Sequence, residues 1–270
     1  MTAAAAPGRT LGSQILAGCR EEGRAALIGY LPVGYPTVPE SIAAMEALIE
    51  GGIDIVEVGV PYSDPLMDGP LIQRATERAL DQGCQVDDVF TAVRAVADAG
   101  STAYVMTYWN LVLRRGVERF AADLAGAGGS GLITPDLIPD EAGEWIEASD
   151  RHGLDRVFLI APSSTRERLT VATAACRGFV YAASTMGVTG TRDSVGSAAA
   201  QVVEHAREVT DLPLCVGLGV STRAQAAEVA GYADGVIVGS ALVRALGEGG
   251  PAAVRALTAE LAAGVREGRR

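Results

Sequence analysis

The sequence predicts a single-domain (β/α)8 barrel of the TIM type. The chain has 270 residues and is 49% hydrophobic, which is enough to bury the core of one barrel-sized domain. Eight short apolar runs recur along it, each followed by a helical stretch. Strands that are apolar throughout and joined by helices are typical of parallel sheets covered on both faces. Eight such units favour a closed barrel.

The expected strands are rich in β-branched and aromatic residues and are bounded by turn-forming residues. In order, they are 25–33, 53–60, 102–108, 131–135, 155–162, 178–184, 212–220 and 233–240. Helical stretches such as 40–52 and 198–210 separate them, and an extra helix is expected before the first strand. A doubly wound open sheet is the alternative. It has no evident place for eight near-equal units, and no GxGxxG motif follows the first strand.

The whole chain, 1–270, is expected to form this one domain, with 1–10 and 265–270 as flexible tails. Two connections are unusually long. The one after the second strand holds an acidic loop and two helical stretches, 70–80 and 86–100. The one after the sixth strand, TMGVTGTRDSVG, is rich in glycine and threonine and is interpreted as a mobile lid.

Composition excludes several classes of function. The net charge is −11, and every one of the 22 basic residues is arginine. An acidic chain without a clustered basic face is a poor partner for nucleic acid or an anionic membrane. The four scattered cysteines have no metal-ligand spacing and indicate reduced thiols. With no signal-peptide pattern and no apolar run near about 18 residues, we expect a cytoplasmic protein.

The stretch VEVGVPYSDPLMDGP, residues 56–70, carries three carboxylates with no arginine or lysine nearby. Alternation along the second strand places Ile53, Ile55 and Glu57 on one face and Asp54, Val56 and Val58 on the other. Glu57 therefore sits at the carboxyl end of the strand, where active sites of this barrel are built. A shielded carboxyl there has a raised pKa, as proton transfer requires.

Each of these acids also has a simpler interpretation. Glu57 could be satisfied by a distant arginine or by backbone amides. Asp64 and Asp68 lie in SDP and DGP contexts, where aspartate commonly bonds its own turn.

Glycines near the end of the chain predict a phosphate site. Gly217 and Gly219 follow the seventh strand, while Gly239 and Ser240 lead from the eighth strand into a helix. Glycine lets backbone amides approach an anion, and a helix N-terminus adds partial positive charge. The loops after strands seven and eight are the usual phosphate position of this barrel. Ordinary strand-to-helix turns are the alternative.

The residues that are present restrict the mechanism. Without lysine, no Schiff base can form on this chain. The two histidines, His152 and His205, fall in helical stretches away from the strand ends, so neither a histidine-bound metal nor a histidine base is favoured. No sequence feature indicates a metal site or a nicotinamide, flavin or pyridoxal site. Carboxylates are therefore expected to act on a phosphorylated small molecule.

The run VEVGVPYSDPLMDGPLIQ closely resembles the signature of the tryptophan synthase alpha chain family. Further matches occur in the family's order and spacing over nearly the whole chain. They are GYLPVGYPT (29–37), MTYWN (106–110), PDL (135–137), YAASTMGVTG (181–190), GLGVS (217–221) and VGSA (238–241).

The resemblance implies a lyase of tryptophan biosynthesis that splits indole-3-glycerol phosphate into indole and glyceraldehyde 3-phosphate. Glu57 falls on the family's catalytic glutamate, and Asp68 on the aspartate that binds the indole N–H. The substrate-binding positions fall on Tyr30, Ile72, Tyr108, Tyr181, Thr189 and Leu218. The phosphate positions fall on Gly190, Gly217, Gly219, Gly239 and Ser240.

The resemblance also implies a partner, the tryptophan synthase beta chain, in an αββα assembly. The pyridoxal phosphate cofactor would belong to that partner, and none is expected in this chain. Asp64, in the loop near the contact, becomes a hypothesis for signalling between the chains.

Three other functions stay open at this point. A stand-alone indole-3-glycerol phosphate lyase would release free indole. A non-catalytic regulatory subunit would keep the fold and activate a beta chain. A triose-phosphate isomerase or epimerase would share only the phosphate loops.

Overall fold

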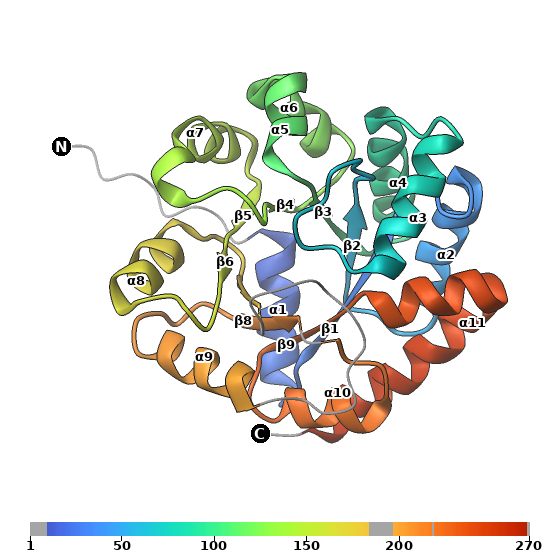
Figure 1. Ribbon diagram of the computed structural model, residues 1–270. Coiled ribbons are helices and arrows are strands. Elements are labelled where there is room, and N and C mark those ends of the chain that lie inside the picture. Colours follow the sequence, from blue (N-terminus) through green and yellow to red (C-terminus); the bar gives the residue numbers. More distant parts are fainter. Residues whose placement is uncertain (1–9, 184–196, 218, 269–270) are drawn as a thin grey trace.

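The computed structural model describes residues 10–183, 197–217 and 219–268, and these form a ring of parallel strands surrounded by helices (Figure 1). The sheet order is β5-β4-β3-β2-β1-β9-β8-β7-β6, and every ladder is parallel. The strands are β1 (Ala26–Pro32), β2 (Ile55–Gly59), β3 (Thr102–Met106), β4 (Gly131–Ile133), β5 (Asp155–Val157), β6 (Leu159–Ile160), β7 (Val180–Ala183), β8 (Leu214–Gly217) and β9 (Gly235–Val238). The barrel expected from the sequence is confirmed.

The helices of the described residues cover the outside of the strands, except for α1. They are α1 (Leu11–Glu21), α2 (Val38–Glu50), α3 (Pro70–Asp81), α4 (Val86–Asp98), α5 (Trp109–Arg115), α6 (Val117–Gly126), the 3₁₀ turn η1 (Pro139–Glu141), α7 (Gly143–His152), α8 (Arg166–Ala175), α9 (Ser197–Arg207), α10 (Arg223–Ala230) and α11 (Ser240–Glu267). None of them is long and apolar enough to cross a membrane.

The expected fifth strand is divided into β5 and β6, with Phe158 between them. β5 pairs with β4, whereas β6 pairs with β7, so one extended segment joins both ends of the sheet order and closes the barrel. At this division the backbone N–H of Phe158 donates to Sγ of Cys176 at 3.4 Å. Nine short strands thus correspond to the eight predicted ones.

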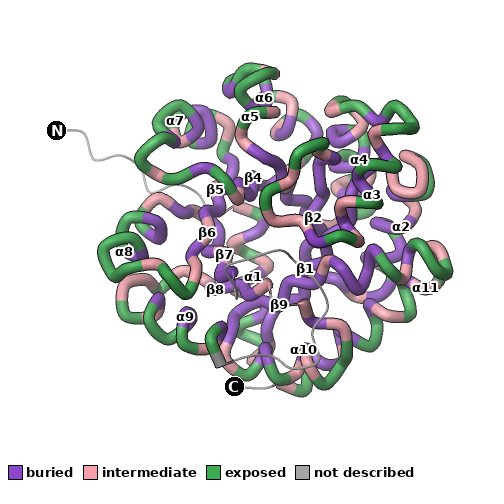
Figure 2. Tube along the Cα trace, viewed as in Figure 1, coloured by how far each residue is buried: buried purple, intermediate pink, exposed green. Residues whose placement is uncertain are grey.

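The barrel interior and the layer under the helices are separate apolar clusters, and both are buried (Figure 2). Ile55 lies in the interior cluster, while Val56 and Val58 lie in the outer one, as alternation along β2 predicts. The prediction for Ile53 is wrong. It precedes the first residue of β2 and packs in the outer cluster, because strand alternation does not apply before the strand begins.

The predicted N-terminal helix is α1, which Figure 1 shows in the middle of the ring. Its buried Leu16 and Cys19 belong to the interior cluster, so α1 closes one end of the barrel. Thr10 caps this helix, and Val265 is buried within α11. Of the expected tails, Thr10 and Val265 are thus held in the fold, whereas Arg266 and Glu267 are exposed.

Two helices after β2 also form as predicted, and their first residues explain where they begin. Gly69 is the N-cap of α3 and Pro70 its first residue, where the missing N–H and fixed φ of proline suit a helix start. Gln85 and Asp88 form a capping box at α4, with the Gln85 N–H donating to the Asp88 carboxylate at 2.7 Å.

Candidate active site

Glu57 lies inside the barrel near the carboxyl end of β2. In the parallel register it stands beside Tyr30 of β1 and Tyr104 of β3. Only 1% of Glu57 is exposed. Val58 and Gly59 alone follow it in the strand, so its carboxyl belongs to the end of the barrel at which parallel strands finish.

Among the described residues, no cation compensates the charge of the Glu57 carboxyl. Burial, followed by the charge of Asp68, raises its pKa to about 8. Its Oε2 atom has no hydrogen-bond partner among the described residues. The simpler interpretation, a glutamate satisfied by a distant arginine, finds no support there. A buried carboxyl that keeps its proton near neutral pH is suited to act as a general acid.

Asp68 lies in the loop between β2 and α3, one residue before the Gly69 N-cap. It is half-buried, and burial raises the pKa of its carboxyl to about 6. Its backbone carbonyl accepts a 2.8 Å hydrogen bond from Nε2 of Gln73 on α3. At neutral pH Asp68 is therefore ionised while Glu57 is protonated, and the two carboxyls can take different roles.

Three of the tyrosines singled out from the sequence share this environment. Burial raises the pKa of Tyr30, and the charges of Asp68 and then Glu57 raise it further. Burial also raises the pKa of Tyr181, with Glu57 the next cause. For Tyr108 burial is again the largest cause, and the charge of Asp68 adds to it. The barrel thus brings these tyrosines, from β1, β7 and the end of β3, around the two acids.

Glycines at the strand ends make room for these rings. A Cβ atom at Gly59 would lie 2.5 Å from the Tyr30 ring and hydroxyl. One at Gly217, expected to bind phosphate, would lie 2.4 Å from the Tyr181 hydroxyl. The requirement for glycine at these two positions is therefore steric, a role that the sequence reasoning missed.

Two of the expected phosphate residues, Gly217 and Gly239, lie beside tyrosines of the acid site. Gly219 adopts a φ of +70°, which favours glycine, and Gly239 is the N-cap of α11 with Ser240 as its first residue. A Cβ at Gly239 would lie 3.4 Å from Tyr30 Cδ1. Tyr30 thus links the acid side to the N-terminus of α11, where backbone N–H groups and the helix dipole favour an anion.

The remaining predicted positions are less informative. Ile72 is buried on α3 within the outer cluster, where plain packing explains it as well as pocket lining does. Asp64 is exposed, and its carboxylate accepts a 2.7 Å hydrogen bond from Ser63 Oγ, as expected of a turn residue. Thr189, Gly190, Leu218 and the proposed lid at 185–196 lie outside the described residues.

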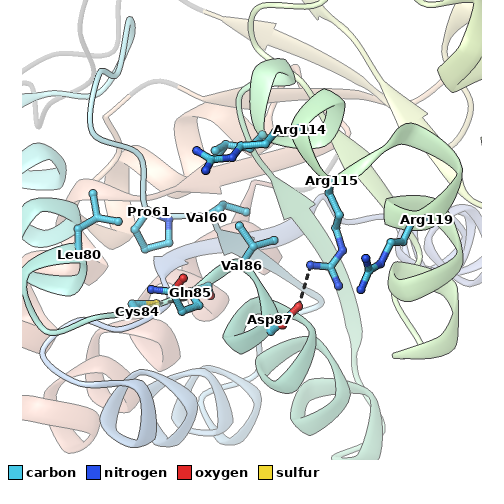
Figure 3. A pocket seen from close by; sticks show the side chains of 11 residues that line it. Val60, Pro61, Leu80, Cys84, Gln85, Val86, Asp87, Arg114, Arg115 and Arg119 are labelled. Atoms are coloured by element: carbon cyan, nitrogen blue, oxygen red, sulfur yellow. Dashed lines mark hydrogen bonds and ion pairs between the residues drawn. The ribbon is translucent and has the colours of Figure 1, made fainter.

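A cavity of about 520 Å³ lies on the outer side of the acidic loop, between the α3–α4 connection and helices α5 and α6 (Figure 3). Its lining mixes apolar and basic side chains: Val60, Pro61, Leu80, Cys84, Gln85, Val86, Asp87, Leu111, Arg114, Arg115 and Arg119. Arg115 forms an ion pair with Asp87 at 2.7 Å. Neither Glu57 nor Asp68 lines this cavity, which was not expected from the sequence.

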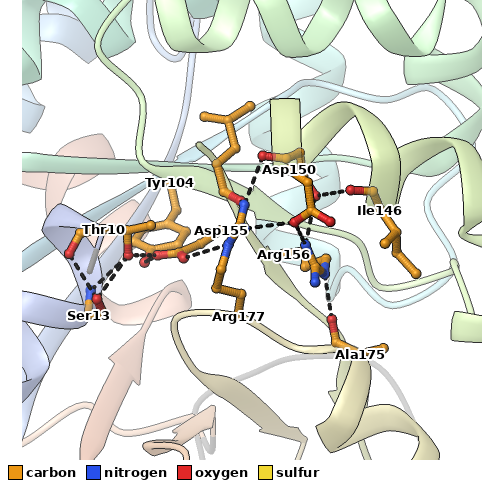
Figure 4. Close-up of polar contacts among 11 residues, drawn as sticks. Thr10, Ser13, Tyr104, Ile146, Asp150, Asp155, Arg156, Ala175 and Arg177 are labelled. Atoms are coloured by element: carbon orange, nitrogen blue, oxygen red, sulfur yellow. Dashed lines mark hydrogen bonds and ion pairs between the residues drawn. The ribbon is translucent and has the colours of Figure 1, made fainter. Parts of the chain in front are cut away.

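A second buried carboxylate, Asp155 (Figure 4), begins β5 and therefore lies at the amino end of the strands, opposite to Glu57. Its Oδ2 accepts 2.6 Å hydrogen bonds from the hydroxyls of Thr10 and Tyr104. Arg177 Nε is 3.7 Å from Oδ1. These contacts hold the start of α1 against the strands, so Asp155 serves the fold.

Comparison with known proteins agrees with this geometry. The family model described as tryptophan synthase alpha chain matches residues 16–267. The tryptophan synthase alpha chain of Mycolicibacterium paratuberculosis is 67% identical over 255 residues, 94% of either chain. Structurally, the chain superposes on tryptophan synthase from Mycobacterium tuberculosis with a TM-score of 0.92 at 63% identity, covering 96% of this chain and 99% of that one. The tryptophan synthase A-subunit of Pyrococcus furiosus gives 0.81 at 33% identity, covering 88% and 97%.

Proposed function

This chain belongs to the tryptophan synthase alpha chain family, and we propose that Glu57 and Asp68 carry its reaction. It is a carbon-carbon lyase of tryptophan biosynthesis that cleaves indole-3-glycerol phosphate into indole and glyceraldehyde 3-phosphate. The observation that carries the residue assignment is the Glu57 carboxyl, which is 1% exposed, has an unpaired Oε2 among the described residues, and has a pKa of about 8.

In the proposed mechanism, protonated Glu57 donates its proton to C3 of the indole ring. Positive charge then develops on the ring. The Asp68 carboxylate accepts a hydrogen bond from the indole N–H and stabilises that charge. The bond between C3 and the side chain breaks as the adjacent hydroxyl becomes the aldehyde of glyceraldehyde 3-phosphate. Glu57 takes up the hydroxyl proton, which restores its starting state. Acid–base catalysis of this kind contributes about 10² to 10⁴ in rate, or roughly 3 to 5 kcal/mol.

The protonated ring is itself the electron sink in this mechanism, so two carboxyls in different protonation states suffice for the chemistry. The pKa of about 8 for Glu57 and about 6 for Asp68 supply those states near neutral pH. We therefore propose that this chain acts without a cofactor of its own and that pyridoxal phosphate belongs to the beta chain.

The substrate would lie between the acid side and the phosphate side. Tyr30, Ile72, Tyr108, Tyr181, Thr189 and Leu218 would surround the indole and side chain. Gly190, Gly217, Gly219, Gly239 and Ser240 would hold the phosphate, with the N-terminus of α11 supplying the partial positive charge.

The partner of the chain is the tryptophan synthase beta chain. We propose an αββα assembly in the cytoplasm, with residues 1–270 acting as one domain. The exposed carboxylate of Asp64 is proposed to signal to the partner. An Asp64→Ala variant that is stimulated by the beta chain as strongly as wild type would remove that role.

The deciding experiment measures the initial rate of indole release from indole-3-glycerol phosphate, with and without a beta chain. Glu57→Gln and Asp68→Asn are compared with Glu77→Gln, the same change at an exposed position of α3. A rate that rises many-fold with the partner, collapses in the first two variants and is kept in the third supports the proposal. A fast rate without partner indicates a stand-alone lyase. Unchanged cleavage by Glu57→Gln indicates a regulatory role.

A further inference from the structure

The Tyr108 hydroxyl holds the backbone of the loop that carries Asp68. Oη of Tyr108, at the end of β3 and the start of α5, accepts hydrogen bonds from the backbone N–H groups of Leu66 at 3.0 Å and Met67 at 3.1 Å. The Leu66 side chain is 72% exposed, so it does not anchor the loop by apolar burial. These two hydrogen bonds end one residue before Asp68.

The anchor is itself held in place. Tyr108 is only 6% exposed, and its ring packs against Tyr62 with centroids 4.9 Å apart. Asn110 Nδ2 donates to the Tyr62 hydroxyl at 2.8 Å, and the backbone N–H of Trp109 donates to the Asp136 carboxylate at 2.9 and 3.1 Å. The Tyr108 ring and the chain beside it are therefore held by Tyr62 of the β2–α3 connection, Asn110 of α5 and Asp136 of the β4–η1 connection.

Asp68 is bracketed between this anchor and helix α3. On one side, the peptides of residues 66 and 67 are tied to Tyr108. On the other, the Asp68 carbonyl accepts from Gln73, and Gly69 begins the helix. Because the backbone is fixed on both sides of Asp68, the position of its carboxyl relative to the barrel is restricted. Such preorganisation matters because a misplacement of about 1 Å can lower a rate by about 100-fold.

We propose that Tyr108 is a positioning residue whose hydroxyl sets the place of Asp68 against the indole N–H of the substrate. This inference rests on the proposed role of Asp68 in the reaction. It is distinct from pocket lining by the Tyr108 ring, because it assigns the function to the oxygen atom as an acceptor of two backbone N–H groups. The hydroxyl acts on the reaction only through the Asp68 loop.

The test is Tyr108→Phe, which keeps the ring and removes the acceptor, assayed in the full chain together with a beta chain. We expect kcat to fall about tenfold, as the loss of two hydrogen bonds suggests, with little change in KM. The acidic limb of the pH profile should move to lower pH, because a loosened loop exposes Asp68 and lets its pKa return toward its ordinary value. Amide hydrogen exchange at residues 66 and 67 should become faster.

The matched control is Tyr232→Phe, the same change at a buried hydroxyl that has no hydrogen-bond partner among the described residues. It should leave kcat, the pH profile and exchange at residues 66 and 67 unchanged. If Tyr108→Phe behaves like this control, the inference is overturned.

A double-mutant cycle with Asp68→Asn separates this inference from the proposed function. If Tyr108 acts through Asp68, adding Tyr108→Phe to Asp68→Asn lowers kcat no further. Effects that multiply would show that Tyr108 acts independently, and the inference fails. If Asp68→Asn alone has the wild-type rate, the proposed role of Asp68 fails instead, whatever the exchange data show about the loop.

Discussion

Glu57 and Asp68 repel each other at the carboxyl end of the barrel: burial, and then the charge of Asp68, raises the pKa of Glu57 to about 8. Burial alone raises the pKa of Asp68, to about 6. Between these two values the site holds one proton on Glu57 and one negative charge on Asp68. That combination provides a general acid beside an anion, as the proposed cleavage requires.

The pH profile of kcat/KM should therefore be bell-shaped. The acidic limb near pH 6 reports protonation of Asp68, and the basic limb near pH 8 reports loss of the Glu57 proton. In Asp68→Asn the residual activity should show a basic limb at lower pH, because the charge that raises the pKa of Glu57 is gone. Steady-state rates from pH 5 to about 9.5 check both limbs. A rate that stays constant through pH 9 would contradict a protonated Glu57.

Glu57 should also make stability depend on pH. Its ordinary pKa is 4.5, so above that pH an unfolded chain releases this proton, whereas the folded chain keeps it up to about pH 8. The folded state binds more protons in this window, so the free energy of unfolding decreases as pH rises through it. Glu57→Gln should be more stable than wild type at pH 8, and its stability should vary less between pH 4.5 and 8. Urea unfolding at several pH values, with Glu77→Gln as control, measures the difference. If the free energy of unfolding has the same slope against pH in Glu57→Gln as in wild type, the raised pKa of Glu57 is contradicted.

Gly59→Ala should damage both packing and activity. The new Cβ would lie 2.5 Å from the Tyr30 ring, so the ring or the strand must move, at a cost of about 1 to 3 kcal/mol of stability. The displaced Tyr30 also borders Gly239 and the N-terminus of α11, so KM for the substrate should rise. Gly126→Ala is the control, because nothing lies within 4 Å of a Cβ at that exposed position of α6. The prediction is wrong if the two variants behave alike.

Thr10→Val should loosen the closed end of the barrel without affecting the active site. The substitution removes the Thr10 hydroxyl, which donates a 2.6 Å hydrogen bond to Asp155. The same hydroxyl caps α1 by accepting a 3.3 Å hydrogen bond from the Ser13 N–H. Loss of a hydrogen bond to a charged group should lower the free energy of unfolding by about 1 to 3 kcal/mol. Thr10→Ser keeps the hydroxyl and should retain most of the stability. Chemical denaturation decides between them, and identical midpoints for all three proteins would contradict the role of Thr10.

The sequence predicted features that depend on local periodicity. Continuous apolar runs separated by helices predicted the barrel, and alternation along β2 correctly separated Ile55 from Val56 and Val58. The same rule failed at Ile53, because alternation holds only within a strand. The split at Phe158 was not predicted: the Phe158 N–H bonds to Cys176, 18 residues further along, a contact that strand periodicity does not reveal.

The candidate site divides in the same way. The sequence by itself determined that Glu57 shares a face of its strand with Ile55 and that Asp68 follows it in a loop, because the two-residue period of a strand and the order of the chain are local properties. Only the tertiary structure decided what surrounds them. Tyr30 lies over Gly59, Tyr181 over Gly217, and the Tyr108 hydroxyl holds the loop before Asp68. These partners come from different strands, and closure of the barrel sets the distances between them.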